Sequence, residues 1–104
     1  MAFPRNCRIV NRGLSLVEMT AAQALKEIRG LAGTNRIRLT QHARERMAER
    51  GATYGDVRNA LANATTCTAE KEAGKWRVKG TDLDGDALTC IVTLDGAAVV
   101  ITLF

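Results

Sequence analysis

Residues 75–104 read KWRVKGTDLDGDALTCIVTLDGAAVVITLF, and this stretch decides the fold. Runs of β-branched residues alternate in it with short segments rich in aspartate and glycine. This alternation is typical of strands joined by tight turns, and an Asp-Gly pair between two apolar runs is a strong signal for a two-residue hairpin turn. The stretch therefore predicts three antiparallel strands, at residues 75–80, 87–94 and 97–104.

A fourth strand is expected just before these three. Residues 65–70, TTCTAE, are also rich in β-branched residues and are separated from the next run by Glu72, Ala73 and Gly74. Further upstream, residues 36–39 read RIRL, and their alternation suits either a short strand or an extended lead-in to a helix. We therefore predict a sheet of about four antiparallel strands.

Three helices are predicted in the first half of the chain. The first follows the N-cap candidate Thr20 and ends at Gly33, and the second runs over residues 41–50 before a glycine. The third opens with a capping-box spacing, in which Asp56 stands three residues after Thr53. Helices followed by antiparallel strands imply an α+β domain with its helices packed on one face of the sheet.

The chain has room for one domain, because its 104 residues match the usual size of a single core. Residues 1–18 show neither helical nor strand periodicity, so we expect a flexible N-terminal tail followed by a single α+β domain at residues 19–104.

No segment is apolar for long enough to span a membrane. The three cysteines form no CxxC pair and lie far in sequence from the one histidine, which favours a cytoplasmic protein without a disulfide framework, metal or cofactor.

Charge is distributed unevenly along the sequence. Fifteen lysines and arginines against eleven acidic residues give a net charge of +4, which favours an acidic partner such as nucleic acid or an acidic protein. Five arginines fall within residues 36–50, whereas aspartates gather at residues 82–86 and at Asp95. We therefore expect one basic face and one acidic loop.

The first basic row lies on the predicted second helix. Residues 39–51 read LTQHARERMAERG, and a helical wheel places His42, Arg46 and Arg50 along one border of the apolar stripe. In a purely structural interpretation, the arginines lay their methylene groups over the core and the histidine makes a hydrogen bond near the helix cap. In a functional interpretation, the row binds a phosphate. The sequence leaves both interpretations open.

The second basic row lies on a predicted strand, where Lys75, Arg77 and Lys79 alternate with apolar residues. Because side chains in a strand change face with a period of two, the three cations share one face. Three like charges on one face repel each other, so something has to compensate them. Glu70 and Glu72 could do so from nearby, and the phosphates of an RNA could do so in a complex.

Together the two rows contain the groups that metal-independent RNA cleavage needs. The reaction requires a base for the 2′-hydroxyl proton, cations for the charged phosphorane and an acid for the leaving 5′-oxygen. Imidazole is the natural proton-transfer group near neutral pH, and a lysine can act as an acid if its pKa is depressed. The predicted catalytic residues are His42, Arg46, Lys75 and Arg77, and the predicted nucleic-acid-binding residues are Arg36, Arg38, Arg50 and Lys79.

The signature L-T-x-H-A-x-x-R-M-x-x-R-G at residues 39–51 is followed by a short helix containing Asp56 and Val57 and then by β-hairpins. Over roughly residues 36–104 this pattern resembles the bacterial family called domain of unknown function 4258. That family looks related to the RelE-like and MqsR-like toxins. The resemblance implies a RelE/barnase-like fold, with N-terminal helices against an antiparallel sheet, and a toxin-type ribonuclease restrained by an antitoxin protein.

Two functions remain in competition at this point. The first is a toxin-type, metal-independent ribonuclease that cleaves RNA through attack of the 2′-hydroxyl, with RNA and an antitoxin as partners. The alternative is a non-catalytic module whose basic face binds nucleic acid or an acidic partner protein. The substitution His42→Ala separates them, because it abolishes cleavage in the first case and removes no activity in the second. A purely structural domain, the third possibility, predicts no effect of this change.

Overall fold

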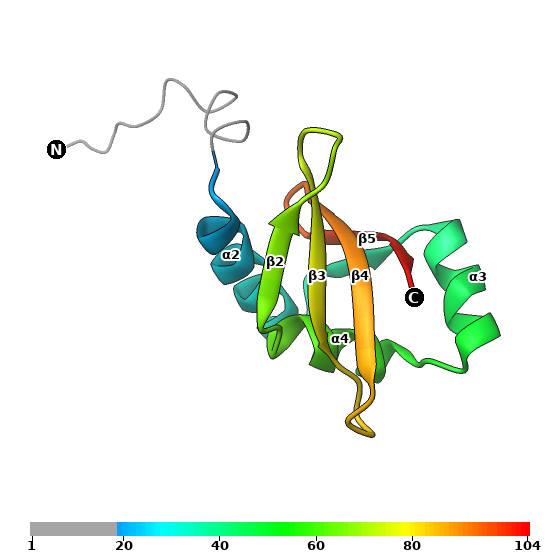
Figure 1. Cartoon of the computed structure of the whole chain (residues 1–104). Coiled ribbons are helices and arrows are strands. Elements are labelled where there is room, and N and C mark those ends of the chain that lie inside the picture. Colours follow the sequence, from blue (N-terminus) through cyan, green and yellow to red (C-terminus); the bar gives the residue numbers. More distant parts are fainter. Residues whose placement is uncertain (1–18) are drawn as a thin grey trace, which may run out of the picture.

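The structure is a computed structural model that describes residues 19–104, and the tail predicted at residues 1–18 lies outside this range. Within this range three helices and five strands form a single α+β unit, which confirms the predicted fold class (Figure 1). The elements are α2 (Ala21–Gly33), β1 (Ile37–Leu39), α3 (Gln41–Arg50), α4 (Tyr54–Ala62), β2 (Thr66–Ala69), β3 (Lys75–Thr81), β4 (Ala87–Leu94) and β5 (Ala98–Leu103).

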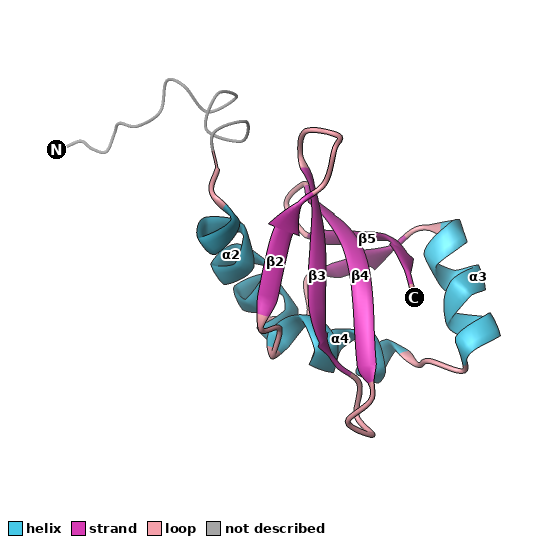
Figure 2. Cartoon of the chain, in the orientation of Figure 1, coloured by secondary structure: helices cyan, strands magenta, loops and turns pink. Residues whose placement is uncertain are grey.

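The sheet has five strands in the order β1-β5-β4-β3-β2, one more than predicted (Figure 2). Strands β2 to β5 form the expected antiparallel meander. The additional strand β1 lies parallel to β5, with Ile37 opposite Ala98, so the sheet is mixed. The sequence could not choose between a strand and a lead-in here, because three residues are too few for alternation to decide and the pairing partner is about 60 residues away.

The turn between β4 and β5 also differs from its prediction. Leu94 pairs with Ala98, so three residues rather than two form the loop. A two-residue type I′ turn needs a positive φ at both central residues. In this loop only Gly96 has a positive φ, of 71°, and Asp95 does not. The Asp-Gly pair therefore marked the hairpin correctly but not its loop length.

Helices α2 and α4 cover one face of the sheet, and α3 lies beside β5 (Figure 1). On β3, Trp76 and Val78 point into the core between the sheet and these helices. Gly80 follows on the same face, where α4 approaches closely. A Cβ atom at Gly80 would lie 2.8 Å from the carbonyl carbon of Ala60 and nearer still to its oxygen. Only glycine fits at this point without moving the helix.

The capping box predicted at Thr53 is present and also ties α4 to the sheet. The carboxylate of Asp56 accepts a hydrogen bond from the Thr53 backbone N–H at 2.9 Å. Its other oxygen accepts from the Leu83 N–H, in the β3–β4 loop, at 3.1 Å. These two backbone hydrogen bonds lower the pKa of Asp56, the Thr53 bond contributing more, because they stabilise the charged carboxylate.

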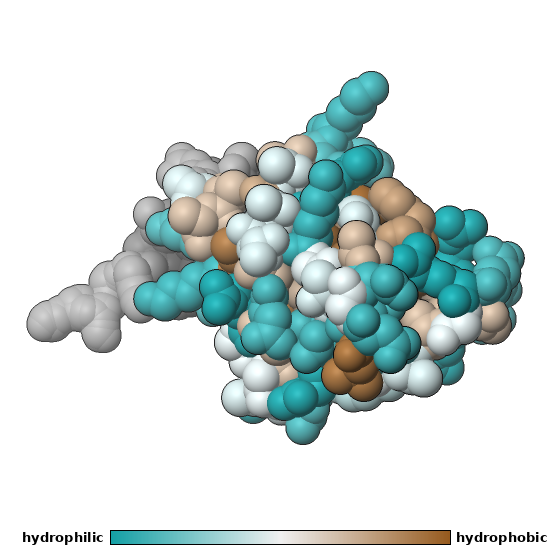
Figure 3. Space-filling model, turned by 60° about the horizontal axis from the view of Figure 1, so that its bottom comes forward, coloured by the Kyte–Doolittle hydropathy of each residue, from teal (hydrophilic) through white to brown (hydrophobic). Residues whose placement is uncertain are grey.

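On the face shown in Figure 3, hydrophilic residues predominate and the most hydrophobic residues form small separate spots. Among residues 19–104, no helix combines the length and the apolar composition needed to cross a membrane.

Candidate functional site

The face of the sheet opposite α2 and α4 carries the basic row of β3. Lys75, Arg77 and Lys79 lie on this open face, while Trp76 and Val78 are buried on the other, as the alternation predicts. The register places Arg77 beside Ile91 of β4 and Lys79 beside Thr89. The open face is therefore polar and basic along β3.

Two of these three cations have acidic partners nearby. Lys75 Nζ lies 2.6 Å from a carboxylate oxygen of Glu72, and Arg77 Nε lies 2.9 Å from one of Glu70. These are the two glutamates that the sequence offered as compensation. Lys79 is exposed and forms no ion pair with any residue in the described range.

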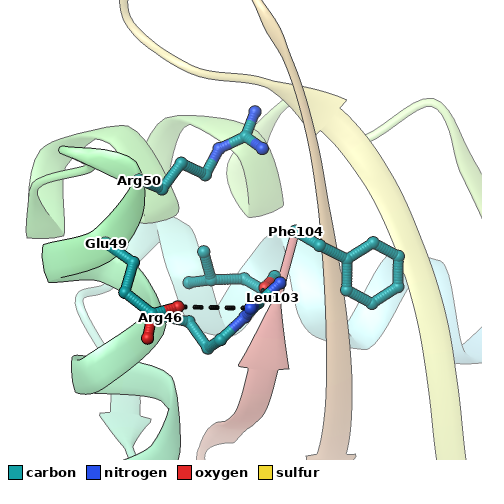
Figure 4. Close-up of a pocket in the computed structure, with 5 residues that line it drawn as sticks. All are labelled: Arg46, Glu49, Arg50, Leu103 and Phe104. Carbon is teal, nitrogen blue, oxygen red and sulfur yellow. Dashed lines mark hydrogen bonds and ion pairs between the residues drawn. The ribbon is translucent and has the colours of Figure 1, made fainter.

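The basic row of α3 lies at a different part of the sheet. Arg46 Nε donates to the carbonyl oxygen of Leu103 at 3.1 Å, and Arg50 Nη2 donates to that of Ala87 at 2.6 Å. Figure 4 shows Arg46 extending from α3 toward Leu103 at the end of β5, and Arg50 extending from the same helix above it. Arg46 Nη1 also lies 3.2 Å from the carboxylate of Glu49. The carbonyl bonds fix both guanidinium groups without neutralising them, because a carbonyl group carries no net charge.

These residues line a pocket of about 250 Å³ at the end of β5 (Figure 4). Among the lining side chains, two arginines and one glutamate leave an excess of one positive charge. Each guanidinium has five N–H donors in a planar fork that matches the geometry of a phosphate. The internal bonds use one or two donors of each arginine, so others remain for an anion. The lining residues, called the C-terminal pocket below, are Arg46, Glu49, Arg50, Leu103 and Phe104.

Phe104 connects the two basic rows. Its side chain is 42% exposed and lines the C-terminal pocket, and in Figure 4 its ring extends from the end of β5 away from α3. The guanidinium carbon of Arg77 lies 5.5 Å from the ring centroid, within the range of a cation–π contact. Phe104 was missing from the predicted site. The alternation that buries Leu103 could have found it, since the next residue has to face the open side.

The structure places His42 on the surface of α3, one helical turn before Arg46. It does not line the C-terminal pocket. Within residues 19–104 its side chain makes no hydrogen bond or ion pair, so the structural hydrogen bond considered from the sequence is not formed with this part of the chain. His42 is accessible to a bound molecule that also reaches Arg46.

Arg36 and Arg38 lie elsewhere. Arg38 is on β1 and pairs with Asp95 of the β4–β5 turn, at 3.3 Å. Arg36 lines a separate cavity of about 440 Å³ together with Glu27 and Asp95. The eight predicted site residues therefore fall into three groups. Arg46, Arg50 and Arg77 lie around Phe104. His42, Lys75 and Lys79 lie on α3 and β3 outside the pocket lining, and Arg36 and Arg38 lie apart, around β1.

No metal or thiol site accompanies these groups in the described range. No cluster of three His, Cys, Asp or Glu side chains among residues 19–104 could hold a metal ion. In the acidic loop, Asp82 uses its carboxylate to accept the N–H groups of Asp84 and Asp86, at 2.9 Å each. Cys90 is buried, and desolvation raises the pKa of its thiol to about 12, a little offset by the charge of Arg50.

Comparison with known proteins identifies a family. Searches of curated proteins and of solved structures found nothing similar. The family model described as Domain of unknown function (DUF4258) matches residues 39–104, from the last residue of β1 through α3 and α4 to β5. The resemblance predicted from the signature at residues 39–51 is thus confirmed, while the likeness to RelE-like toxins stays a prediction. Since the match covers more than half of the sequence, the chain belongs to the DUF4258 family.

Proposed function

We propose that the protein is a toxin-type, metal-independent endoribonuclease that binds RNA across the C-terminal pocket and the open face of the sheet. The observation that carries this proposal is the pair Arg46 and Arg50. Both guanidinium groups are fixed by bonds to neutral carbonyls, keep their charge and line one pocket. Glu49 pairs with Arg46 but Arg50 has no acidic partner in the described range, and such a fixed pair of arginines suits a phosphate better than it suits a neutral ligand.

The residues around the pocket can be given roles in cleavage. The 2′-oxygen of one nucleotide attacks the adjacent phosphorus, and its proton passes to a base. The resulting phosphorane carries additional negative charge, which Arg46 and Arg50 stabilise. The bond to the 5′-oxygen then breaks, and this oxygen takes up a proton. His42 exchanges one of these protons and solvent water the other, because imidazole both accepts and donates protons near neutral pH.

The basic row of β3 extends the same surface. Lys79 is exposed, and Arg77 lies against the ring of Phe104, which itself lines the pocket. A strand of RNA bound at the pocket would therefore meet further cations along β3. Lys75 would join them if an RNA phosphate displaced Glu72. An enzyme of this kind has to be restrained in its own cell, so the proposal includes an antitoxin protein as a second partner.

The test is cleavage of single-stranded RNA by purified protein in the presence of EDTA. We expect fragments with a 2′,3′-cyclic phosphate and a 5′-hydroxyl, and a loss of about 100-fold or more in rate for His42→Ala. The matched control is Arg44→Ala, which changes an exposed residue of α3 outside the pocket. Inducible expression in a bacterium should arrest growth with wild-type protein and with the control, and His42→Ala should relieve the arrest. Full RNA integrity with folded wild-type protein would reject the proposal.

A second candidate is the non-catalytic module that only binds nucleic acid or an acidic protein. Two observations favour it: His42 lies outside the pocket lining, and Lys75 and Arg77 already have glutamate partners. This candidate predicts RNA binding that weakens as salt rises, without cleavage. Lys79→Glu would reduce that binding, whereas His42→Ala would leave it unchanged.

A further inference from the structure

The two edges of the sheet differ in how far other parts of the chain cover them. Along β5, three carbonyl groups accept hydrogen bonds from residues outside the sheet. The Thr40 N–H donates to Val100 at 3.1 Å and its hydroxyl donates to Ile101 at 2.8 Å, while Arg46 donates to Leu103. Strand β1 pairs with the rest of β5. β1 and α3 therefore cover this edge of the sheet.

At the opposite edge of the sheet lies β2, and its outer backbone groups have no partner strand in the described range. The Glu70 N–H donates to Lys75 of β3, at 2.9 Å. Hydrogen-bonded positions alternate along an antiparallel pair, so the N–H and C=O groups of Cys67 and Ala69 point away from β3. No other strand of the described range pairs with them. The four residues of β2 include no charge and no proline, the usual devices that protect an edge.

A shallow groove lies on α2, the helix that stands beside β2 (Figure 1). It has a volume of about 280 Å³, and its floor is mainly apolar, from Ala22 and Leu25. Lys26 and Arg29 complete the lining. Neither cation forms an ion pair within residues 19–104. The groove thus offers an apolar contact and two positive charges next to an open strand edge.

We infer that an extended acidic segment of a partner protein adds to β2 as a sixth strand. Its backbone would bond to the outward groups of Cys67 and Ala69. Because side chains alternate, every second one would face the α2 side, where the methylene groups of a glutamate meet Leu25 and its carboxylate meets Lys26 or Arg29. A second copy of this chain fits less well, because it would bring like-charged groups together. The inference is independent of RNA cleavage, since the partner would bind at the β2 edge, whereas the C-terminal pocket lies at the end of β5.

The test is a titration of isotope-labelled full-length protein with a short acetylated peptide in which glutamate and valine alternate. We expect saturable shifts and slower hydrogen exchange at the amides of Cys67 and Ala69. A peptide with lysine in place of glutamate should bind much more weakly. Lys26→Glu and Ala69→Pro should each weaken binding by about tenfold or more. Ala69→Pro removes only an outward N–H, so the pairing with β3 is kept. Arg44→Glu, a charge reversal on α3, should leave binding unchanged.

Several results would overturn the inference. The first is the absence of saturable shifts at Cys67 and Ala69 with millimolar acidic peptide, and the second is equal affinity for the lysine peptide. A dimer that Ala69→Pro dissociates would assign the edge to a second copy. Nuclear Overhauser contacts from Cys67 to residues 1–18 would assign it to the chain itself. If Ala69→Pro does not fold, Lys26→Glu and the lysine peptide decide the question.

Discussion

The close approach of α4 to β3 allows a sharp test of the fold through Gly80→Ala. The new Cβ would lie 2.8 Å from the carbonyl carbon and 3.0 Å from the Cα of Ala60, whereas carbon atoms in contact normally lie about 3.5 Å apart or more. The obstacle is backbone, so it cannot rotate away, and α4 has to move by roughly 0.7 Å or more. Overpacking of this kind costs about 1–3 kcal/mol. The lower chain entropy of alanine in the unfolded state returns about 0.5–1 kcal/mol. The two ranges leave a net loss of up to about 2.5 kcal/mol, and we expect about 1 kcal/mol.

The matched control is Gly30→Ala on the exposed side of α2. A Cβ at Gly30 would have no atom within 4 Å, so the substitution should stabilise the helix by about 1 kcal/mol. Urea unfolding, followed by the fluorescence of the buried Trp76, measures both free energies. In a thermal scan, Gly80→Ala should lower the Tm by roughly 4–8 °C. If Gly80→Ala were as stable as the wild type, α4 could not lie against β3 as described.

Three further predictions follow from single contacts. Arg46→Met should lower the free energy of unfolding by about 1–2 kcal/mol, because the Leu103 carbonyl loses its charged donor, whereas Arg44→Met on the same helix should change little in the same urea experiment. Hydrogen bonds lower the pKa of Asp56 in the folded state, so the stabilising contribution of its carboxylate is present at neutral pH and is lost as the pH falls below about 4. The difference in the free energy of unfolding between wild type and Asp56→Asn should therefore shrink between pH 6 and pH 3. A constant difference would contradict this. Cys90, with its pKa raised to about 12, should resist iodoacetamide at pH 8 until the protein unfolds, as peptide mapping by mass spectrometry would show.

The sequence located most elements because their signals are local. Thr20, Thr40 and Thr53 each accept a hydrogen bond from the third residue of the helix that follows, and this depends only on neighbouring residues. The β-branched runs and their turns likewise predicted β2 to β5. Alternation along β3 also assigned the correct face to each side chain, since the period of a strand is a property of its own backbone.

What the tertiary structure alone decided is which of these elements meet. No local pattern could show that β1 pairs with β5, that Arg46 and Arg50 bond to carbonyls at the end of the sheet, or that Arg77 lies against Phe104. Each of these contacts joins residues tens of positions apart, and each depends on how the helices and the sheet pack. The sequence by itself determined the secondary structure, the basic character of two rows and the family. The packing determined that Phe104 lies between Arg77 of one row and the pocket lined by Arg46 and Arg50 of the other, and that the edge at β2 stays open.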